Sequence, residues 1–329
     1  MRGVVDVKFL GVPQPRPVVL DEVQRRPEIF PMLRVLVDRP RSARFLVLGS
    51  AAPELLAQSS ETLAGRIAFH PLEGLDLAEV TPQSLGRLWL RGGFPRSYTA
   101  PRGAVSLQWR RDFIQTFLER DLPMLGIRTA EPTMRRFWSM LAHVHDSTLN
   151  WSELGRSMGV SDMTVRRYLD SLSGTFVVRQ LEPWFENISK RQVKSPKVYV
   201  TDSGLLHALL DIESQEQLDG HPKVGASWEG FVIAQVVCRL GARPEQCFFW
   251  ATHAGAEIDL LVIAGGRRLG FKVKLTTAPA ATASARSALA ELGLERVDVV
   301  HAGTDTYPLS DRIRALAASR ILDDLKPLS

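Results

Sequence analysis

The chain has 329 residues, which at about 150 residues per domain predicts two or three domains. Hydrophobic residues make up 45% and charged residues 23%, an ordinary globular composition that excludes a largely disordered chain. No apolar run approaches the roughly 20 residues of a membrane helix, and no secretion leader is recognisable at the N-terminus, so we expect a cytoplasmic protein without membrane association. The net charge of +5 favours polyanionic partners only weakly.

The first hundred residues alternate apolar strands with helices. An apolar run at residues 17–20 ends in Asp21 and Glu22, a helix follows from Pro31, and a second apolar run at residues 44–50 ends at Ser50. Such alternation predicts a parallel α/β sheet that binds ligands at the carboxyl ends of its strands. We therefore expect Asp21, Glu22 and Ser50 at the ligand-binding edge of this sheet.

The string VVLDEVQ, residues 18–24, has the form of a Walker B element. In such an element Asp21 holds Mg²⁺ and Glu22 polarises the attacking water. Ser50, at the end of the next strand, stands where a polar residue commonly contacts the γ-phosphate. Strands that end in Asp-Glu are common, so the ATPase interpretation depends on the combination with FLVLGS at residues 45–50.

The sequence of the middle of the chain predicts a helical region followed by a motif of two helices and two strands. Residues 101–150 show helical periodicity, with aromatic side chains at spacings that favour a packed core rather than a cofactor site. Residues 151–202 predict a winged helix-turn-helix. Its parts are a helix at 153–158 capped by Ser152, a turn at Gly159, a second helix at 162–172 capped by Ser161, and strands at 175–179 and 197–201.

The second helix of this motif carries the candidate nucleic-acid contacts. Asp162, Thr164, Arg166 and Arg167 would lie at or near duplex DNA. Between residues 156 and 197 the chain has eight basic side chains against four acidic ones, the excess that a phosphate-contacting surface needs. The alternative is that this motif serves packing or protein interaction, as such modules often do in multidomain ATPases.

Residues 203–329 predict another α/β region. A helix at 226–240 precedes strands at 247–251, 257–263 and 269–274, and the pair Gly265-Gly266 predicts a hairpin turn. A helix at 283–292, a strand at 296–301 and a final helix at 310–321 complete it. The candidate functional residues are Glu229 on the first helix, Asp259 on the second strand, and Lys272 and Lys274 on the third.

Four strings in the sequence resemble the predicted AAA+ superfamily ATPases of bacteria and archaea: LDEVQRRPEIFPMLRVLVDR, FLVLGSAAPELL, SSETLAGRI and LRGGFP. In that family a P-loop domain precedes a helix-turn-helix region and a C-terminal domain. The resemblance runs from about residue 17 to residue 308. It implies that Asp21 and Glu22 are the Walker B pair, that Ser50 is sensor 1, and that Arg66 is a phosphate-sensing arginine. It also implies ATP and Mg²⁺ as cofactors of the full-length family.

One part of that family pattern is absent. A P-loop requires Gly-x-x-x-x-Gly-Lys-Ser/Thr, whose amides and lysine bind the phosphates, and the sequence contains no Gly-Lys dipeptide. A start codon placed too late, a truncated gene, and a product that no longer hydrolyses ATP would each explain this. We therefore expect no ATPase activity from this chain. ATP and Mg²⁺ are expected for the full-length family, and this chain can be one that binds neither.

The C-terminal candidates resemble a second family. Glu229 on a helix, Asp259 on a strand and Lys272-Val273-Lys274 on the next strand are similar to the PD-(D/E)XK nuclease fold over residues 226–300. This resemblance implies that the carboxylates hold one or two Mg²⁺ ions and that Lys274 stabilises charge at the attacked phosphate. Lys272 stands where that family has a carboxylate, and a cation there would repel Mg²⁺. We expect no cleavage, and a nuclease-like fold retained for binding or packing.

Together these features predict an α/β protein in four parts. They are a truncated AAA+-like ATPase domain with a partial parallel sheet at residues 1–100, a helical region at 101–150, a winged helix-turn-helix at 151–202, and a nuclease-like α/β domain at 203–329. The predicted function is that of an ATPase-family protein with nucleic-acid-binding modules, inactive as an ATPase without its P-loop. The alternatives are a non-catalytic DNA-binding protein and a metal-dependent nuclease. The nucleic-acid target and the oligomeric state stay open.

Overall fold

The computed structural model describes residues 2–6, 17–23, 26, 28–39, 44–50, 63–70, 72–185, 195–253 and 255–328. Contacts between residues divide the chain into two units. The first comprises residues 1–74 and 169–176, and the second comprises residues 75–168 and 177–329. Within the described ranges, every helix is too short or too polar to span a lipid bilayer.

The first unit contains a four-stranded sheet. Its order is β2 (Val18–Leu20), β3 (Phe45–Ser50), β1 (Arg2–Asp6) and β4 (Ala68–His70). β2 and β3 are parallel, as the sequence predicts. β1 is antiparallel to both β3 and β4, so the sheet is mixed and the prediction of a parallel sheet is right for one strand pair only. Helix α1 (Ile29–Val37) buries Phe30, Leu33 and Val37 at helical spacing.

The second unit begins with a series of helices. They are η2 (Pro82–Ser84), α3 (Leu85–Arg91), α4 (Pro95–Tyr98), α5 (Gly103–Thr116), the π-helical turn η3 (Phe117–Asp121), α6 (Leu122–Met124) and α7 (Glu131–His143). Aromatic side chains pack along them, with the ring centroids of Phe113 and Phe117 5.9 Å apart and those of Phe117 and Trp138 5.4 Å apart. The helices and the aromatic core predicted for this region are therefore present.

Two helices and an antiparallel strand pair follow along the chain, and the end of the second helix, from Leu169, belongs to the first unit. α8 (Trp151–Met158) and α9 (Asp162–Gly174) are joined through Gly159, which has a left-handed φ of 70°. Ser161 accepts a hydrogen bond from the Thr164 amide, as a cap of α9 should. α8 begins earlier than predicted, because Asn150 rather than Ser152 accepts the Glu153 amide. β6 (Val178–Pro183) pairs with β7 (Lys197–Val200), which also pairs with β5 (Ser147–Thr148).

The strands of the second unit form one sheet in the order β12-β13-β11-β10-β9-β8-β6-β7-β5. Its C-terminal part contains β8 (Cys247–Ala251), β9 (Glu257–Ala264), β10 (Arg267–Lys274), β11 (Arg296–His301), β12 (Tyr307–Ser310) and β13 (Ile313–Ala317). β8, β9 and β10 are antiparallel neighbours, whereas β11 is parallel to β10. β6 joins β8 through two residue pairs, Glu182–Phe248 and Pro183–Phe249, so the junction between the two parts of the sheet is short.

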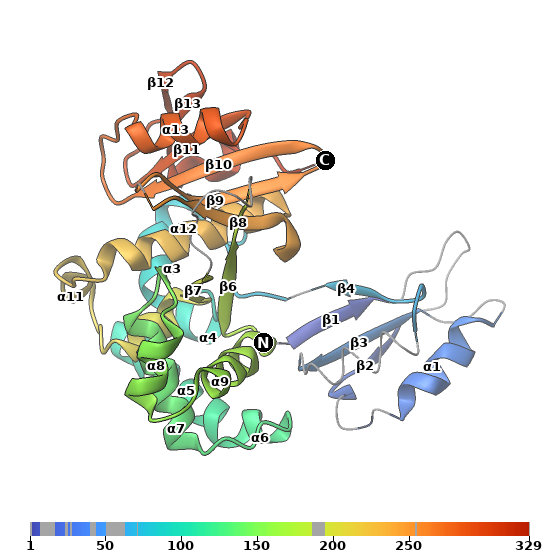
Figure 1. Ribbon diagram of the computed structural model, residues 1–329. Coiled ribbons are helices and arrows are strands. Elements are labelled where there is room, and N and C mark those ends of the chain that lie inside the picture. Colours follow the sequence, from blue (N-terminus) through green and yellow to red (C-terminus); the bar gives the residue numbers. More distant parts are fainter. Residues whose placement is uncertain are drawn as a thin grey trace. The chain divides into compact units, whose positions relative to one another are not determined.

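Helices cover both faces of the C-terminal strands (Figure 1). α10 (Ser203–Leu209), α11 (Gln215–Asp219), α12 (Val224–Leu240) and the turn η4 (Pro244–Gln246) precede β8, and α13 (Ala283–Glu291) connects β10 to β11. Ile258 of β9 packs with Ala285 and Ala288 of α13. The next residue, Asp259, points to the opposite face, which α12 covers. The observed order α12-β8-β9-β10-α13-β11 agrees with the order of helices and strands predicted from the sequence.

The final helix predicted at residues 310–321 is wrong. This region begins at the last residue of β12, β13 occupies its middle, and η5 (Ala318–Arg320) and the short helix α14 (Ile321–Asp324) follow. β13 lies inside the sheet, parallel to β11, and its Ile313, Ala315 and Leu316 are buried. A strand covered on both faces has a nearly continuous apolar sequence, which residue spacing cannot distinguish from a buried helix.

A buried polar junction connects the end of α3 with the start of α10. Asp202 caps α10 by accepting the Leu205 amide at 2.9 Å, and it also accepts the Gly93 amide at 2.7 Å. Gly204 lies against the backbone of Arg91, whose carbonyl oxygen would collide with a Cβ at that position. The glycines on both sides therefore allow the two helix ends to meet directly, which gives the LRGGFP string a packing role.

Gly204→Ala tests this close approach. The added methyl group must displace the backbone of Arg91, and we expect a loss of about 3 kcal/mol in the free energy of unfolding, measured by urea denaturation. Gly86→Ala in α3 is the matched control, because its Cβ meets nothing within 4 Å. That control should be neutral or stabilising by up to about 1 kcal/mol. Equal stability of the two variants would contradict the packing role.

Candidate functional site

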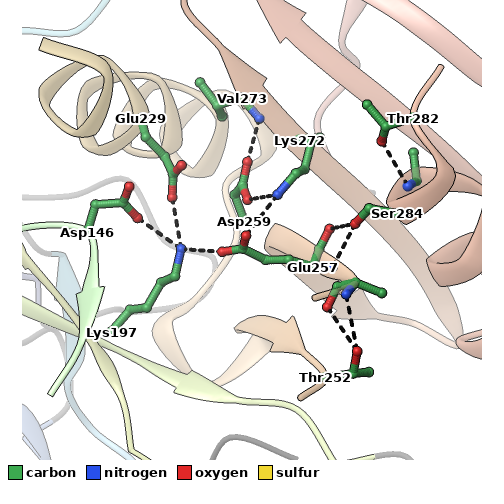
Figure 2. A network of polar contacts seen from close by, with 12 residues as sticks. Asp146, Lys197, Glu229, Thr252, Glu257, Asp259, Lys272, Val273, Thr282 and Ser284 are labelled. Atoms are coloured by element: carbon green, nitrogen blue, oxygen red, sulfur yellow. Dashed lines mark hydrogen bonds and ion pairs between the residues drawn. The ribbon is translucent and has the colours of Figure 1, made fainter. Parts of the chain in front are cut away.

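Seven side chains of the second unit meet in a buried carboxylate–lysine centre, and Figure 2 labels all of them except Tyr199. They are Asp146 before β5, Lys197 and Tyr199 on β7, Glu229 on α12, Glu257 and Asp259 on β9, and Lys272 on β10. Because side chains alternate along a strand, residues two apart on β7 and on β9 share one face. The alternation of side chains on β7 and β9 and the packing of α12 therefore bring five of the seven groups together. Asp146 and Lys272 join them from the neighbouring segments before β5 and on β10.

Lys272 is bound by the two carboxylates of β9. Its Nζ lies 2.5 Å from Oδ1 of Asp259 and 3.2 Å from Oε2 of Glu257. The second oxygen of Asp259 accepts the Val273 amide at 2.7 Å. The side chains of Lys272 and Asp259 are only 7% and 1% exposed, so each charge depends on the other for its stabilisation.

Lys197 is surrounded by three carboxyl groups. Its Nζ lies 2.7 Å from Oε1 of Glu257, 2.9 Å from Oδ1 of Asp146 and 3.2 Å from Oε1 of Glu229. An ammonium has three hydrogens, so each has an acceptor here. Glu257 contacts Lys197 with one oxygen and Lys272 with the other, and thereby bridges the two cations.

The Tyr199 hydroxyl lies between two carboxyl groups. Its oxygen is 3.1 Å from Oδ1 of Asp146 and 3.0 Å from Oε1 of Glu229. A phenol has a single hydrogen and can donate to only one of them. The other contact is favourable when that carboxyl group carries a proton and donates it to the phenol oxygen. The geometry therefore favours one bound proton shared among these three side chains.

The carboxyl groups of the centre differ in their acidity. Burial raises the pKa of Glu229 well above its ordinary value, and the nearby carboxylates of Asp259 and Asp146 raise it further against the attraction of Lys197. Burial also acts to raise the pKa of Glu257, but the ammonium groups of Lys197 and Lys272 outweigh it and lower that pKa to about 2. Glu257 is therefore ionised at physiological pH.

Gly230 determines how closely α12 approaches β7. A Cβ at this position would collide with Nε2 of the buried His145 and would lie 3.1 Å from the Tyr199 ring. His145 accepts the Val200 amide through Nδ1, and burial lowers its pKa to about 4. The imidazole is therefore neutral at physiological pH and adds no third cation to the centre.

This donor set does not fit Mg²⁺. Both oxygens of Asp259 already accept hydrogen bonds, and the Lys272 ammonium occupies the space next to Oδ1. A divalent ion about 4 Å from that ammonium would be repelled by on the order of 8 kcal/mol at an effective dielectric constant near 20. Among the residues that the structure describes, no group of three or more His, Cys, Asp or Glu side chains is arranged to hold a metal ion.

The structure brings together three of the four predicted C-terminal residues. Glu229, Asp259 and Lys272 belong to the centre, whereas Lys274 is exposed at the end of β10. Sequence reasoning missed Asp146, Tyr199 and Glu257 and counted Lys197 among the surface cations. Two signals were available. Glu257 stands two residues before Asp259 on the same strand, and Lys197 and Tyr199 alternate with valines in a strand that is buried throughout.

Asp21, Glu22 and Ser50 lie at the carboxyl ends of the parallel strands β2 and β3, whereas Arg66 precedes β4 at the opposite end of the sheet. Asp21 directly follows β2, and its Oδ1 accepts the Glu22 amide at 2.9 Å. Ser50 ends the parallel strand β3, and its side chain lies outside the described residues. Arg66 makes a two-pronged contact with Asp38, at 2.7 and 2.9 Å, so a phosphate would have to displace that carboxylate. The described residues of this unit include no lysine, and they do not form a cradle that fits Mg-ATP.

The nucleic-acid candidates lie on α9. Val165 is fully buried, as predicted, while Arg166 and Arg167 are exposed and Thr164 is half-buried. The Arg166 guanidinium lies 4.0 Å from the ring centroid of Trp151 on α8. Asp162 accepts a hydrogen bond from Ser152. The basic excess at the surface is smaller than predicted, because Lys197 is buried in the centre; Lys190, Arg191 and Lys194 lie outside the described residues.

Comparisons with known proteins divide the chain into three consecutive matches. Residues 5–81 match an AAA domain, residues 82–216 match a domain of unknown function, DUF8612, and residues 224–321 match another, DUF4143. The uncharacterized protein Rv2008c of Mycobacterium tuberculosis is 50% identical over 306 residues, which cover 93% of this chain and 69% of that protein. The uncharacterized protein Mb2031c of Mycobacterium bovis matches to the same extent. No solved structure matches the chain.

The chain combines a mixed α/β fold with an AAA domain match at its N-terminal end. It belongs to the same family as these two mycobacterial proteins, an AAA-like, ATPase-related family. ATP and Mg²⁺ are consistent with such a family.

The N-terminal geometry predicts weak nucleotide binding. We expect a dissociation constant for Mg-ATP no tighter than about 1 mM by calorimetry, because Asp21 needs phosphate oxygens held by other groups to complete a metal site. Asp21→Ala should leave this value unchanged. Micromolar affinity that disappears in Asp21→Ala would show that the edge of this sheet does bind the nucleotide.

The raised pKa of Glu229 predicts a specific dependence of stability on pH. The folded state keeps a proton that the unfolded state releases above about pH 4.5, so this group contributes less to stability as the pH rises towards its folded pKa. Glu229→Gln cannot ionise, and relative to wild type its free energy of unfolding should rise by about 1.4 kcal/mol per pH unit over that range. The exposed Glu216→Gln is the control. Parallel curves for wild type and Glu229→Gln between pH 5 and 8 would contradict the prediction.

Proposed function

We propose that this chain is a DNA-binding protein of the AAA-like, ATPase-related family, and that it contacts duplex DNA through α9. The exposed arginine pair Arg166-Arg167 carries the proposal. These residues lie on the second helix of a two-helix motif that is followed by an antiparallel strand pair. In helix-turn-helix proteins that second helix enters the major groove.

The orientation of α9 supports contact with a phosphate backbone. Val165 and Leu169 are fully buried and define the inner side of the helix. At about 100° per residue, Arg167 lies roughly 200° around the helix from Val165 and therefore points away from the inner side. Met163, which is 73% exposed, lies on this outer side as well. An exposed cation and an apolar side chain together suit contact with phosphates and with a base edge.

Arg166 is positioned by its contact with Trp151. The two side chains come from the two helices of the motif, and their stacking holds the guanidinium at the side of α9. An arginine fixed in this way loses less conformational freedom when it binds a phosphate. Two adjacent arginines with different orientations could therefore contact two phosphates.

Metal-dependent cleavage is not favoured as the function. Lys197 and Lys272 occupy the carboxylates that the nuclease interpretation requires as metal ligands. The proposal therefore keeps DNA binding and omits hydrolysis of DNA. For the C-terminal strands we propose a role in binding or packing.

The test replaces Arg166 and Arg167 together by Ala and measures binding to duplex DNA at several salt concentrations. Loss of two phosphate contacts should weaken binding and reduce the slope of log affinity against log salt by about 1.8, because each contact contributes roughly 0.9. The free energy of unfolding should stay within about 1 kcal/mol of wild type, because both side chains are exposed and the lost contact between Arg166 and Trp151 contributes no more than this.

The control removes the same net charge elsewhere. Arg120 and Arg267 are exposed, and each is paired with a neighbouring carboxylate. The double variant Arg120→Ala/Arg267→Ala should keep the wild-type slope. An unchanged slope and affinity in the α9 variant would assign this helix to packing or to a protein partner.

A further inference from the structure

We propose that Lys197 and Lys272 are permanent internal cations that replace metal ions in the carboxylate–lysine centre, and that Lys197 thereby fastens the strand layer of β5, β6 and β7 to the C-terminal strands. The centre is then an internal docking site whose ligand is a lysine of the same chain. This inference does not depend on DNA binding.

The bridging carboxylate is the first observation. Glu257 is 2.7 Å from one ammonium and 3.2 Å from the other, with a different oxygen for each. A carboxylate that bridges two cations in this way occupies the position of a bridging ligand in a two-metal centre. Both lysine side chains are only 7% exposed, so neither ammonium can return to water without leaving buried carboxylates unpaired.

The origin of Lys197 is the second observation. It lies on β7, within the DUF8612 match, whereas Glu229, Glu257, Asp259 and Lys272 all lie within the DUF4143 match. The backbone connection between these strand layers is limited, because β6 and β8 share two residue pairs. Of the three carboxyl groups that contact Lys197, those of Glu229 and Glu257 lie across this short junction, so two contacts from a single side chain add to it.

The chemical consequence follows from the difference between an ammonium and a metal ion. An ammonium neutralises carboxylates and donates hydrogen bonds, but it offers no open coordination position for water or phosphate. The stability of the centre should therefore be independent of divalent ions. It should depend on the two lysines, and it should not depend on Lys274, which is exposed and has no ion pair in the described part of the chain.

The experiment compares thermal unfolding of the full chain in EDTA and in millimolar MnCl₂. We expect the same Tm for the wild type in both conditions. Lys197→Met and Lys272→Met should each lower Tm by on the order of 10 °C, whereas the matched control Lys274→Met should shift it by less than about 2 °C. Amide hydrogen exchange should rise at β6 and β8 in Lys197→Met relative to Lys274→Met, and the β10–β11 pair should change less.

A charge-balanced variant keeps the test decisive if a single variant fails to fold. Lys197→Met/Glu257→Gln removes one charge of each sign, and its loss in Tm should be smaller than the sum of the two single losses, or it should fold where Lys197→Met does not. A wild-type Tm that rises with Mn²⁺ and loses this rise in Asp259→Asn would overturn the proposal. So would additive losses, equal effects of Lys197→Met and Lys274→Met, or unchanged exchange at β6 and β8.

Discussion

The balance of buried charge is the constraint on which the second unit depends. Asp259 lies on an interior strand at 1% exposure, where an isolated carboxylate would cost several kcal/mol. Lys272 on the neighbouring strand supplies the opposing charge, and Glu257 extends the ionic chain to Lys197. One sheet, one helix and a strand from an earlier part of the chain are therefore tied to a common set of charges. Apolar packing would tolerate other residues of similar size at these positions. Buried charges do not, because each carboxylate needs a cation beside it.

Local patterns predicted most of the C-terminal fold. The strands around Phe249, Asp259 and Val299 have apolar runs bounded by turns, and the left-handed glycines at 265 and 266 form the predicted hairpin. The prediction was wrong at residues 310–321, where neighbouring strands decide the structure. The position of β1 between β3 and β4 was also unpredicted, because strand order depends on contacts far apart in the sequence.

The candidate site was predicted only in part, because some of its residues come from distant parts of the chain. Glu229, Asp259 and Lys272 stand at spacings that place them on one helix and two adjacent strands, so sequence order alone brings them close. Lys197 and Asp146 reach the same centre from a different part of the sheet. A lysine is usually solvated, and the valines on either side of Tyr199 were the one local sign that this lysine lies in a buried strand. The excess of basic side chains near α9 was overestimated for this reason.

Gly230 links the shape of a helix to the chemistry of its neighbour. It carries no charge and contacts no carboxylate, yet the missing side chain lets α12 rest against His145 and Tyr199. Any larger residue would push the helix outward and lengthen the distance between Glu229 and Lys197. Because Coulomb energy and hydrogen bonding both weaken with separation, such a substitution would alter the acidity of the centre while every ionisable group remained in the sequence. In this protein a residue without a side chain sets the strength of an electrostatic interaction between two charged neighbours.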